Sequence, residues 1–188
     1  MDERELTALA RRIGTLPPHA GTTTVVLIDG PSGSGKSTFA VRLAAASGAS
    51  VLAVEDMYPG WDGLEVAAER VVTDVLEPLA RGEAASIRRW DWERSMEAGR
   101  DPVPAAELLI IEGVGSGSRA AAAYASLLIW LEADAAERYA RAMRRDGELF
   151  VDHWDRWAAQ ERAFFAREDT RERADLRYRT DEPTWAEE

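Results

Sequence analysis

Residues 22–29 read TTTVVLID and run directly into GPSGSGKS at residues 30–37. The first segment is β-branched with an apolar middle, which is typical of a parallel strand buried on both faces of a sheet. The second is a glycine-rich loop of the kind that wraps nucleotide phosphates, and residues 36–46 favour a helix that Gly48 would end. Strand, loop and helix in this order predict a phosphate-binding P-loop.

Lys36 stands out because it is the only lysine in the chain, whereas arginine occurs 22 times. The chain uses arginine for its surface charge, so one retained ammonium indicates a site that a guanidinium does not fill. A loop wrapped closely around phosphates leaves room for a compact charge on a flexible stem, while a planar guanidinium needs a wider opening. Coding bias explains the rarity of lysine but not its position.

The loop is expected to bind ATP through its backbone and through two side chains. N–H groups from Ser32 to Lys36, together with the positive end of the following helix, make a concave anion site. Lys36 is expected to reach the β- and γ-phosphates, and the Ser37 hydroxyl to ligate Mg²⁺. The predicted cofactor-binding residues are Gly30, Ser32, Gly33, Ser34, Gly35, Lys36, Ser37 and Thr38.

A second acid that organises the magnesium ion is expected at the end of a neighbouring strand. Glu112 follows four apolar residues at 108–111 and precedes Gly113, so its carboxylate is accessible at a strand end. Ser37 and Glu112 are therefore the predicted metal ligands, and ATP with Mg²⁺ is the predicted cofactor. The alternative is that Glu112 is an exposed carboxylate at the end of a strand and binds no metal.

Strands and helices alternate along the chain. Strands are expected at 22–29, 50–54, 85–90, 108–113, 126–131 and 174–179, and helices at 2–14, 36–46, 64–76 (closed by Pro78), 134–145 and 152–170. This alternation predicts an α/β fold, namely a three-layer α/β/α sandwich with a mostly parallel five-stranded sheet, of the P-loop NTPase kinase type. Residues 1–188 are expected to form a single domain, in which residues 1–21 are an N-terminal helix and linker.

The composition limits the class of function. A net charge of −11 and a pI near 4.8 argue against nucleic-acid binding, which needs a basic surface. Cysteine is absent, which excludes disulfides and thiolate metal sites. The charged start is unlike a signal peptide, and no apolar run approaches the ~18 residues of a membrane span, so a cytoplasmic protein without membrane contact is expected.

Two adjacent acids, Glu55 and Asp56, follow the short strand at 50–54 and are candidates for a catalytic base. A carboxylate at this edge of the sheet could accept the proton of an acceptor hydroxyl. Neighbouring side chains of an extended chain point to opposite faces, so only one of the two should face the phosphates. The pattern leaves the choice open, and a solvated loop or helix cap is the alternative.

Several segments, taken in order, resemble uridine kinase-like P-loop kinases. These are the loop at 30–38, Glu55-Asp56-Met57-Tyr58, Trp90-Asp91-Trp92 and Glu112-Gly113. The resemblance spans about residues 22–180 and implies transfer of a phosphoryl group from ATP to a hydroxyl. Counted back from Tyr58, the position of the family's catalytic aspartate is occupied by Glu55 in this chain. Because the residue there is a glutamate instead of an aspartate, Asp56 remains the competing candidate for the base.

The resemblance also implies a substrate pocket, because Trp90-Asp91-Trp92 matches a segment that lines the nucleoside pocket of the family. The predicted substrate-binding residues are Tyr58, Trp61, Trp90, Asp91 and Arg94. Trp61 could equally close the core as a turn aromatic. The family's contacts to a uracil-type base have no counterpart here beyond Arg94, so the acceptor stays open among nucleosides and other small hydroxyl compounds.

Arginines on the predicted helix at 134–145 resemble a kinase lid, taken as about residues 141–153. Arg141 and Arg145 are four residues apart and share a face, so they are predicted to close over the γ-phosphate. Pairing with acids such as Glu137 on an exposed helix is the alternative. The predicted catalytic residues are Lys36, Glu55, Asp56, Arg141 and Arg145.

Aromatic residues recur at helical spacing within 152–170, among them Trp157 and Phe164. Glu161 interrupts this stripe. The stripe is expected to be core rather than a base-stacking platform, and His153 is expected to be a surface or capping residue.

The predicted function is an ATP-dependent kinase that phosphorylates a hydroxyl of a nucleoside or similar small molecule. A nucleoside monophosphate kinase is a second candidate, and it would need an arginine-rich acceptor site, for which Arg88, Arg89 and Arg94 form the compact cluster. A non-catalytic NTP-binding module or regulatory ATPase is a third. GTP-type base recognition is disfavoured because the chain has no asparagine and its one lysine is already in the loop.

Overall fold

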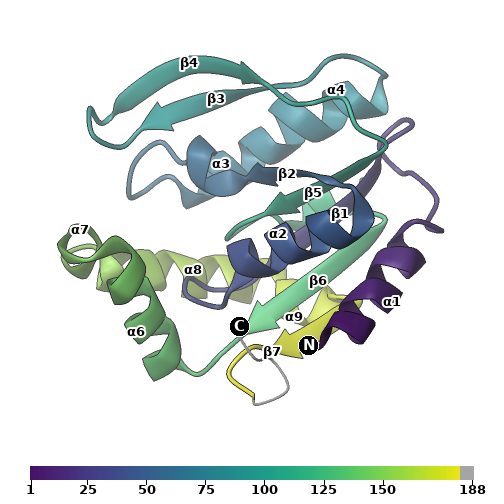
Figure 1. Ribbon diagram of the computed structural model, residues 1–188. Helices are drawn as coiled ribbons and strands as arrows, with labels where there is room; N and C mark the ends of the chain where they lie inside the picture. Colours follow the sequence, from purple (N-terminus) through teal and green to yellow (C-terminus); the bar gives the residue numbers. More distant parts are fainter. Residues whose placement is uncertain (183–188) are drawn as a thin grey trace.

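The computed structural model describes residues 1–182, without the side chains of Asp146, Glu148 and Leu149. Helices surround a central sheet, and a separate two-stranded hairpin lies at the top of the view in Figure 1. No helix within residues 1–182 is both long enough and apolar enough to cross a membrane.

The central sheet has five parallel strands in the order β2-β5-β1-β6-β7. They are β1 Thr24–Asp29, β2 Ser50–Ala53, β5 Leu108–Glu112, β6 Leu127–Glu132 and β7 Leu176–Arg179. β1 lies in the middle, where Ile28 is in register with Glu112 on one side and Ile129 on the other. The carboxyl ends of all five strands therefore lie at one edge of the sheet, which is where ligands bind in open α/β sheets.

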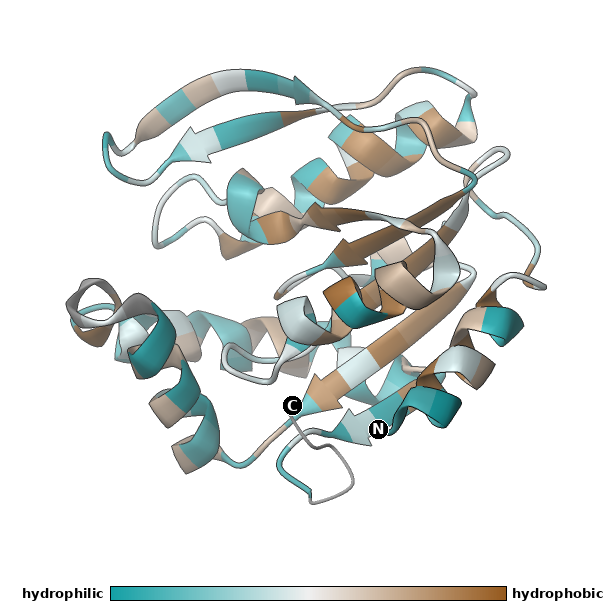
Figure 2. Ribbon diagram, in the orientation of Figure 1, coloured by the Kyte–Doolittle hydropathy of each residue, from teal (hydrophilic) through white to brown (hydrophobic). Residues whose placement is uncertain are grey.

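Helices cover both faces of the sheet. They are α1 Glu3–Ile13 and α2 Lys36–Ser47 on one face, and α3 Leu64–Arg70, the π-helical segment η2 Val71–Leu76, α5 Arg119–Ala122 and α8 Trp154–Glu168 on the other. Alternation along β1 explains this, because Val26 and Ile28 face the first layer while Val25 and Leu27 face the second. Figure 2 shows the apolar residues concentrated on the central strands. The predicted three-layer α/β/α sandwich is confirmed.

The helix predicted to close at Pro78 continues past that residue. α3 passes into η2 and then into α4 (Glu77–Ala80), where Pro78 lies in the first turn. Proline is tolerated in a first turn because its missing N–H has no partner to lose there, and the wider π-turns of η2 let the chain begin a new turn. The prediction that Pro78 ends the helix is wrong.

The strand predicted at 85–90 forms a hairpin instead of joining the central sheet. β3 (Ser86–Asp91) pairs antiparallel with β4 (Met96–Pro102), and a bulge between Arg88 and Trp90 shifts the register by one residue. An ion pair fastens the hairpin to the helix layer, because Arg88 donates hydrogen bonds to both carboxylate oxygens of the buried Asp74, at 2.9 and 3.0 Å.

The remaining elements are short or follow the outer strands. They are η1 Val54–Met57 after β2, α6 Ala135–Asp146 and α7 Glu148–Val151 after β6, and α9 Thr170–Arg173 before β7. α6 and α8 agree with the helices predicted at 134–145 and 152–170. No pattern predicts α5, α7 or α9, because a helix of four residues is too short to show a helical period.

Candidate functional site

The P-loop connects β1 to α2 and has a backbone conformation that needs glycine. Gly33 has a φ angle of 78°. A Cβ atom at Gly33 would lie 2.2 Å from the carbonyl oxygen of Arg138, so no larger residue fits there. Ser32, Gly33, Lys36 and Ser37 line a cavity of about 570 Å³. Four of the predicted cofactor-binding residues therefore lie on one cavity wall.

The other four predicted loop residues, Gly30, Ser34, Gly35 and Thr38, do not line this cavity. Ser34 is fully buried, and its carbonyl oxygen accepts a hydrogen bond from the Thr180 hydroxyl at 3.0 Å. The loop is thereby attached to the segment that follows β7.

Lys36 is buried next to the loop that precedes it. Its Nζ donates a hydrogen bond to the carbonyl oxygen of Pro31 at 3.0 Å. Burial lowers the pKa of Lys36, and the Glu112 carboxylate acts in the opposite direction. A partly desolvated ammonium interacts more strongly with an anion than a hydrated one does, so this position suits contact with a phosphate.

Ser37, in the first turn of α2, and Glu112, at the end of β5, meet in the cavity. Burial raises the pKa of Glu112, while Lys36 and the Ser37 hydroxyl lower it. A hydroxyl and a carboxylate are oxygen ligands of the kind Mg²⁺ prefers, and Mg²⁺ usually keeps water and phosphate oxygens at its other positions. The pair fits a magnesium ion that arrives with a nucleotide.

Within the described part of the chain, no group of three or more His, Cys, Asp or Glu residues is arranged to hold an ion. A metal ion bound by Ser37 and Glu112 would therefore depend on the nucleotide for further ligands.

Asp29, at the end of β1, joins the P-loop to the loop after β5. It is fully buried, and it accepts hydrogen bonds from the N–H groups of Gly30, Gly115 and Gly117 at 2.7, 3.0 and 2.8 Å. Burial raises the pKa of Asp29 to about 6, and the three hydrogen bonds oppose that shift. Asp29 was not among the predicted site residues, although an acid placed between an apolar strand and a glycine loop is a signal for it.

We expect the stabilising contribution of Asp29 to weaken as pH rises. Its pKa is raised from 3.8 to about 6, so between these values the native state holds a proton that the unfolded state has lost. The contribution is fully present below the unfolded pKa and is lost as pH rises through the folded pKa. Relative to Asp29→Asn, which does not titrate, the wild-type protein should lose up to about 3 kcal/mol of unfolding free energy from about pH 4 to about pH 7.

Urea unfolding of both proteins across this pH range measures the difference directly. Other acids titrate equally in the two proteins, so they cancel in the comparison. A difference between the proteins that does not change with pH would show that burial does not perturb Asp29.

Glu161, on α8, holds the opposite side of the P-loop. Its buried carboxylate accepts hydrogen bonds from the Ser32 N–H group and from the Trp157 indole, both at 2.8 Å. The same indole N–H also lies 2.9 Å from the Ser32 hydroxyl oxygen. The acid that interrupts the aromatic stripe thus positions the loop. No role for Glu161 was predicted, although a buried acid within an apolar stripe needs hydrogen-bond donors.

The cavity extends from the P-loop to a wall of aromatic side chains. They are Tyr58, Trp61, Trp92, Phe150, His153 and Trp157. The wall is assembled from three separate parts of the chain: the segment after β2, the turn of the β3–β4 hairpin, and the α7–α8 region. His153, which was expected to be a surface or capping residue, is the N-cap residue of α8 and also belongs to this wall.

One of the two candidate bases faces the cavity. Both acids lie in η1, and Glu55 is part of the lining while Asp56 is not. The Glu55 carboxylate is 4.0 Å from the Arg145 guanidinium. Successive residues of a 3₁₀-helix point about 120° apart, which separates the two side chains. Of the two candidate acids, Glu55 is therefore the one that lies on the cavity wall.

The predicted substrate-binding residues divide into two groups. Tyr58 and Trp61 line the cavity, whereas Trp90, Asp91 and Arg94 do not. Asp91 and Arg94 pair with each other at 3.5 Å, and the Arg94 side chain is 77% exposed. The residues of this segment that do line the cavity are Trp92 and Glu93. The segment after β3 therefore lines the cavity, but through residues other than the three that were predicted.

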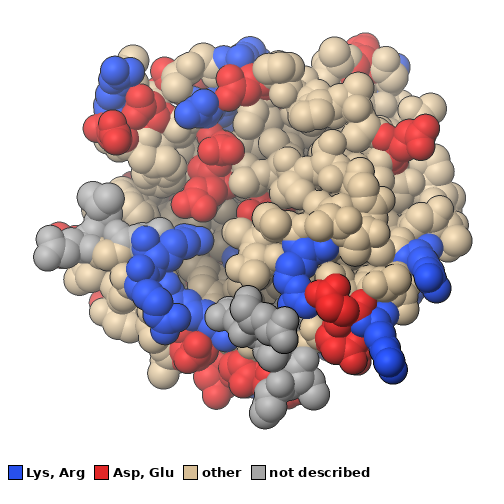
Figure 3. Space-filling model, viewed as in Figure 1, with Lys and Arg blue, Asp and Glu red and all other residues tan. Residues whose placement is uncertain are grey.

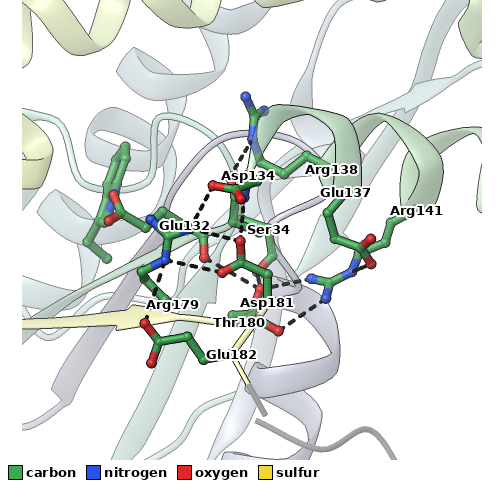
Figure 4. Close-up of polar contacts among 12 residues, drawn as sticks. Ser34, Glu132, Asp134, Glu137, Arg138, Arg141, Arg179, Thr180, Asp181 and Glu182 are labelled. Carbon is green, nitrogen blue, oxygen red and sulfur yellow. Dashed lines mark hydrogen bonds and ion pairs between the residues drawn. The ribbon is translucent and has the colours of Figure 1, made fainter. Parts of the chain in front are cut away.

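Arg141 binds the segment after β7 and does not line the cavity. Its Nε donates a hydrogen bond to Glu137 at 2.9 Å. Its two Nη atoms donate to the hydroxyl and carbonyl oxygens of Thr180, at 2.8 and 3.1 Å (Figure 4). The sequence left open whether Arg141 belongs to a lid or pairs with Glu137 on its own helix. The structure shows the pairing with Glu137.

Arg145, in contrast, lies on the cavity wall near both Glu55 and Lys36, where its charge helps to lower the pKa of Lys36. Phe150 and His153 line the same cavity. Three residues of the segment 141–153 therefore contribute to the wall. Figure 3 shows the hollow in the surface, with basic side chains over α6 below it and acidic side chains above it.

The arginine cluster expected for a phosphate-bearing acceptor is used elsewhere. Arg88 is paired with Asp74, and Arg89 lies 3.4 Å from Asp101 on the facing strand. Neither lines the cavity. The structure therefore offers no observation that favours a nucleoside monophosphate as acceptor.

Residues 26–149 match a protein-family model described as AAA domain. The match covers more than half of the chain and includes the P-loop, Glu55 and Glu112. No curated protein sequence matches the chain.

Two solved structures share the fold over nearly their whole length. A possible uridine kinase from Bacillus stearothermophilus has a TM-score of 0.65 and 18% identity, covering 95% of this chain and 100% of that one. A candidate fructose transport system kinase from a Silicibacter species has a TM-score of 0.59 and 22% identity, covering 92% of this chain and 98% of that one. The chain therefore has the nucleotide-binding fold of P-loop kinases, and the resemblance seen in its sequence is confirmed at the level of fold.

Proposed function

Because the chain belongs to the AAA domain family, we propose that it is an ATP-dependent kinase that transfers the γ-phosphoryl group to a hydroxyl of a nucleoside or similar small molecule. One observation carries this proposal: Lys36, the Ser37–Glu112 pair and Glu55 lie on the wall of one cavity. A phosphate-binding loop, a metal-binding pair and a carboxylate base are the groups that phosphoryl transfer to an alcohol requires.

The nucleotide is held by the chain before any bond changes. Backbone N–H groups of the P-loop and the Lys36 ammonium bind its phosphates, and Glu161 and Asp29 keep the loop in shape through their hydrogen bonds. Mg²⁺, held by Ser37 and Glu112, would neutralise charge on the phosphate oxygens.

Glu55 acts on the acceptor. Its carboxylate takes the proton of the acceptor hydroxyl as the hydroxyl oxygen attacks the γ-phosphorus. A phosphorus–oxygen bond to the acceptor forms, and the bond from the γ-phosphorus to its bridging oxygen breaks, so that ADP leaves with the electron pair. Glu55 is exposed and can pass the proton to water.

Residues 141–153 serve as the lid in this proposal. Arg145 lies on the cavity wall and stabilises negative charge on the transferring group, while the aromatic side chains of the lid exclude water. Arg141 would join only after leaving Thr180. The chain acts as a single cytoplasmic domain on a small molecule, and its net charge of −11 disfavours nucleic acid as a partner.

The test is ADP release from Mg²⁺-ATP with a panel of nucleosides, nucleotides and small alcohols. One class of hydroxyl compound should stimulate release at least about tenfold over water, with an equal amount of phosphorylated product. Lys36→Ala is the control for contaminating kinases. Release without stimulation by any acceptor would favour a regulatory ATPase, and stimulation by nucleoside monophosphates alone would favour a nucleoside monophosphate kinase.

A further inference from the structure

The aromatic wall of the cavity is closely stacked. The Trp61 ring stacks with the rings of His153 and Phe150, with centroid distances of 4.4 and 5.3 Å and interplanar angles of 17° and 23°. The Trp92 ring lies 5.0 Å from Trp61, at 56°. Aromatic rings in several orientations therefore enclose the end of the cavity that lies away from the P-loop.

Two polar groups of this wall are already used within the protein. The Tyr58 hydroxyl donates to the carbonyl oxygen of Val114 at 2.8 Å, and the Trp157 indole is bound by Ser32 and Glu161. No asparagine or glutamine is among the described lining residues. A neutral base read by hydrogen bonds needs such donors and acceptors, because its polar edge would otherwise be buried without partners.

Charge in the cavity is divided between its two ends. The phosphate end holds Lys36 and Arg145 together with the carboxylates of Glu55 and Glu112. The hairpin end contributes Glu93, directly after Trp92, and Glu93 forms no hydrogen bond or ion pair with the residues that the structure describes. The hairpin end thus combines aromatic ring faces with a carboxylate that has no cationic partner among the described residues.

Aromatic faces attract cations through the ring quadrupole, and aromatic cages bind quaternary ammonium groups in this way. A carboxylate beside the rings adds a favourable charge interaction. We therefore infer that the acceptor is a hydroxyl compound that carries a positive charge, with the cation against Trp61, Trp92 and Glu93 and the hydroxyl toward Glu55. This inference rests on the proposed kinase function. The class of positively charged hydroxyl compounds includes simple ammonium alcohols as well as nucleosides with a cationic base.

Two matched pairs of small alcohols test the charge at constant shape. The first pair is choline and its neutral isostere 3,3-dimethylbutan-1-ol. The second is 3-(hydroxymethyl)-1-methylpyridinium and 3-methylbenzyl alcohol. Binding to the full chain, with Mg²⁺ and a non-hydrolysable ATP analogue, is followed by ligand-observed NMR. Each cation should bind at least about tenfold more tightly than its neutral partner.

Variants assign the preference to particular side chains. Trp61→Leu and Glu93→Gln should each reduce binding of the cations at least about threefold and leave the neutral alcohols within about twofold. Glu107→Gln is the matched control, because Glu107 is an exposed acid outside the cavity and its loss changes the net charge equally. Circular dichroism verifies that each variant is folded.

Neutral alcohols that bind as tightly as the cations would overturn the inference, and so would failure of both cations to bind at millimolar concentration. An equal effect of Glu107→Gln and Glu93→Gln would also overturn it, because it would assign the preference to net charge. Cation-selective binding without phosphoryl transfer to any acceptor would contradict the kinase proposal alone. Rapid phosphorylation of a neutral alcohol would retain the kinase and reject the cationic acceptor.

Discussion

Lys36→Ala is expected to lower acceptor-dependent ADP release by about a hundredfold to a thousandfold, because the variant loses the one ammonium beside the P-loop. Lys36 is buried there, so its charge acts on bound phosphates with little screening by water. No other lysine can replace it. Steady-state ADP release measures the loss, and circular dichroism together with thermal unfolding checks that the fold is retained.

Lys36→Arg separates charge from shape. It preserves a positive charge, but a planar guanidinium is wider than an ammonium and does not fit a closed loop as well. We expect Lys36→Arg to lose most of the activity too, whereas Arg42→Lys, a charge-preserving change on the far turns of the same helix, should leave the rate within about twofold. Unchanged turnover in Lys36→Ala would remove the P-loop from the active site.

Glu55→Gln is expected to lower the rate of phosphoryl transfer by about a hundredfold or more, because it removes the carboxylate on the cavity wall that can accept the hydroxyl proton. The amide has nearly the same shape, so ATP binding should change little. Single-turnover rates and nucleotide affinity, measured separately, distinguish a lost base from a lost binding site.

Asp56→Asn is the matched comparison, because Asp56 is the adjacent acid of η1 but does not line the cavity. Its rate should stay within about threefold of the wild type. If Asp56→Asn is the slower variant, the base assignment is reversed. If neither variant is slower, the acceptor binds elsewhere.

The fold and the phosphate end of the site could be predicted from local patterns. β1, the glycine loop and α2 adjoin in sequence, so residues 22–48 alone contain the signal. Glu112 could be found in the same way, because a buried strand leads directly to it. In both cases a run of apolar residues defines the strand, and parallel pairing brings its carboxyl end to the same edge of the sheet.

The acceptor end could not be predicted in this way. The predictions placed Trp90, Asp91 and Arg94 in the pocket, whereas the structure has Trp92 and Glu93 there. The β-bulge between Arg88 and Trp90 adds a one-residue shift to the hairpin. Because side chains alternate between the two faces of a strand, such a shift changes which residues face a neighbour.

Glu161 and Arg141 show the same limit over a longer range. Glu161 binds Ser32, from which it is separated by most of the chain, and Arg141 binds Thr180. A sequence pattern shows that such side chains need partners but does not show where those partners lie.

Residues 22–48 were therefore sufficient to predict a P-loop with Lys36 at the start of its helix, because a strand, a tight glycine turn and a helix start are specified by neighbours along the chain. Tertiary packing alone decided that Glu55 rather than Asp56 faces the cavity, that Arg145 rather than Arg141 joins it, and that an aromatic wall with Glu93 closes its far end. These choices depend on how η1, the hairpin and the α7–α8 region pack together, and that geometry is not encoded in any one segment.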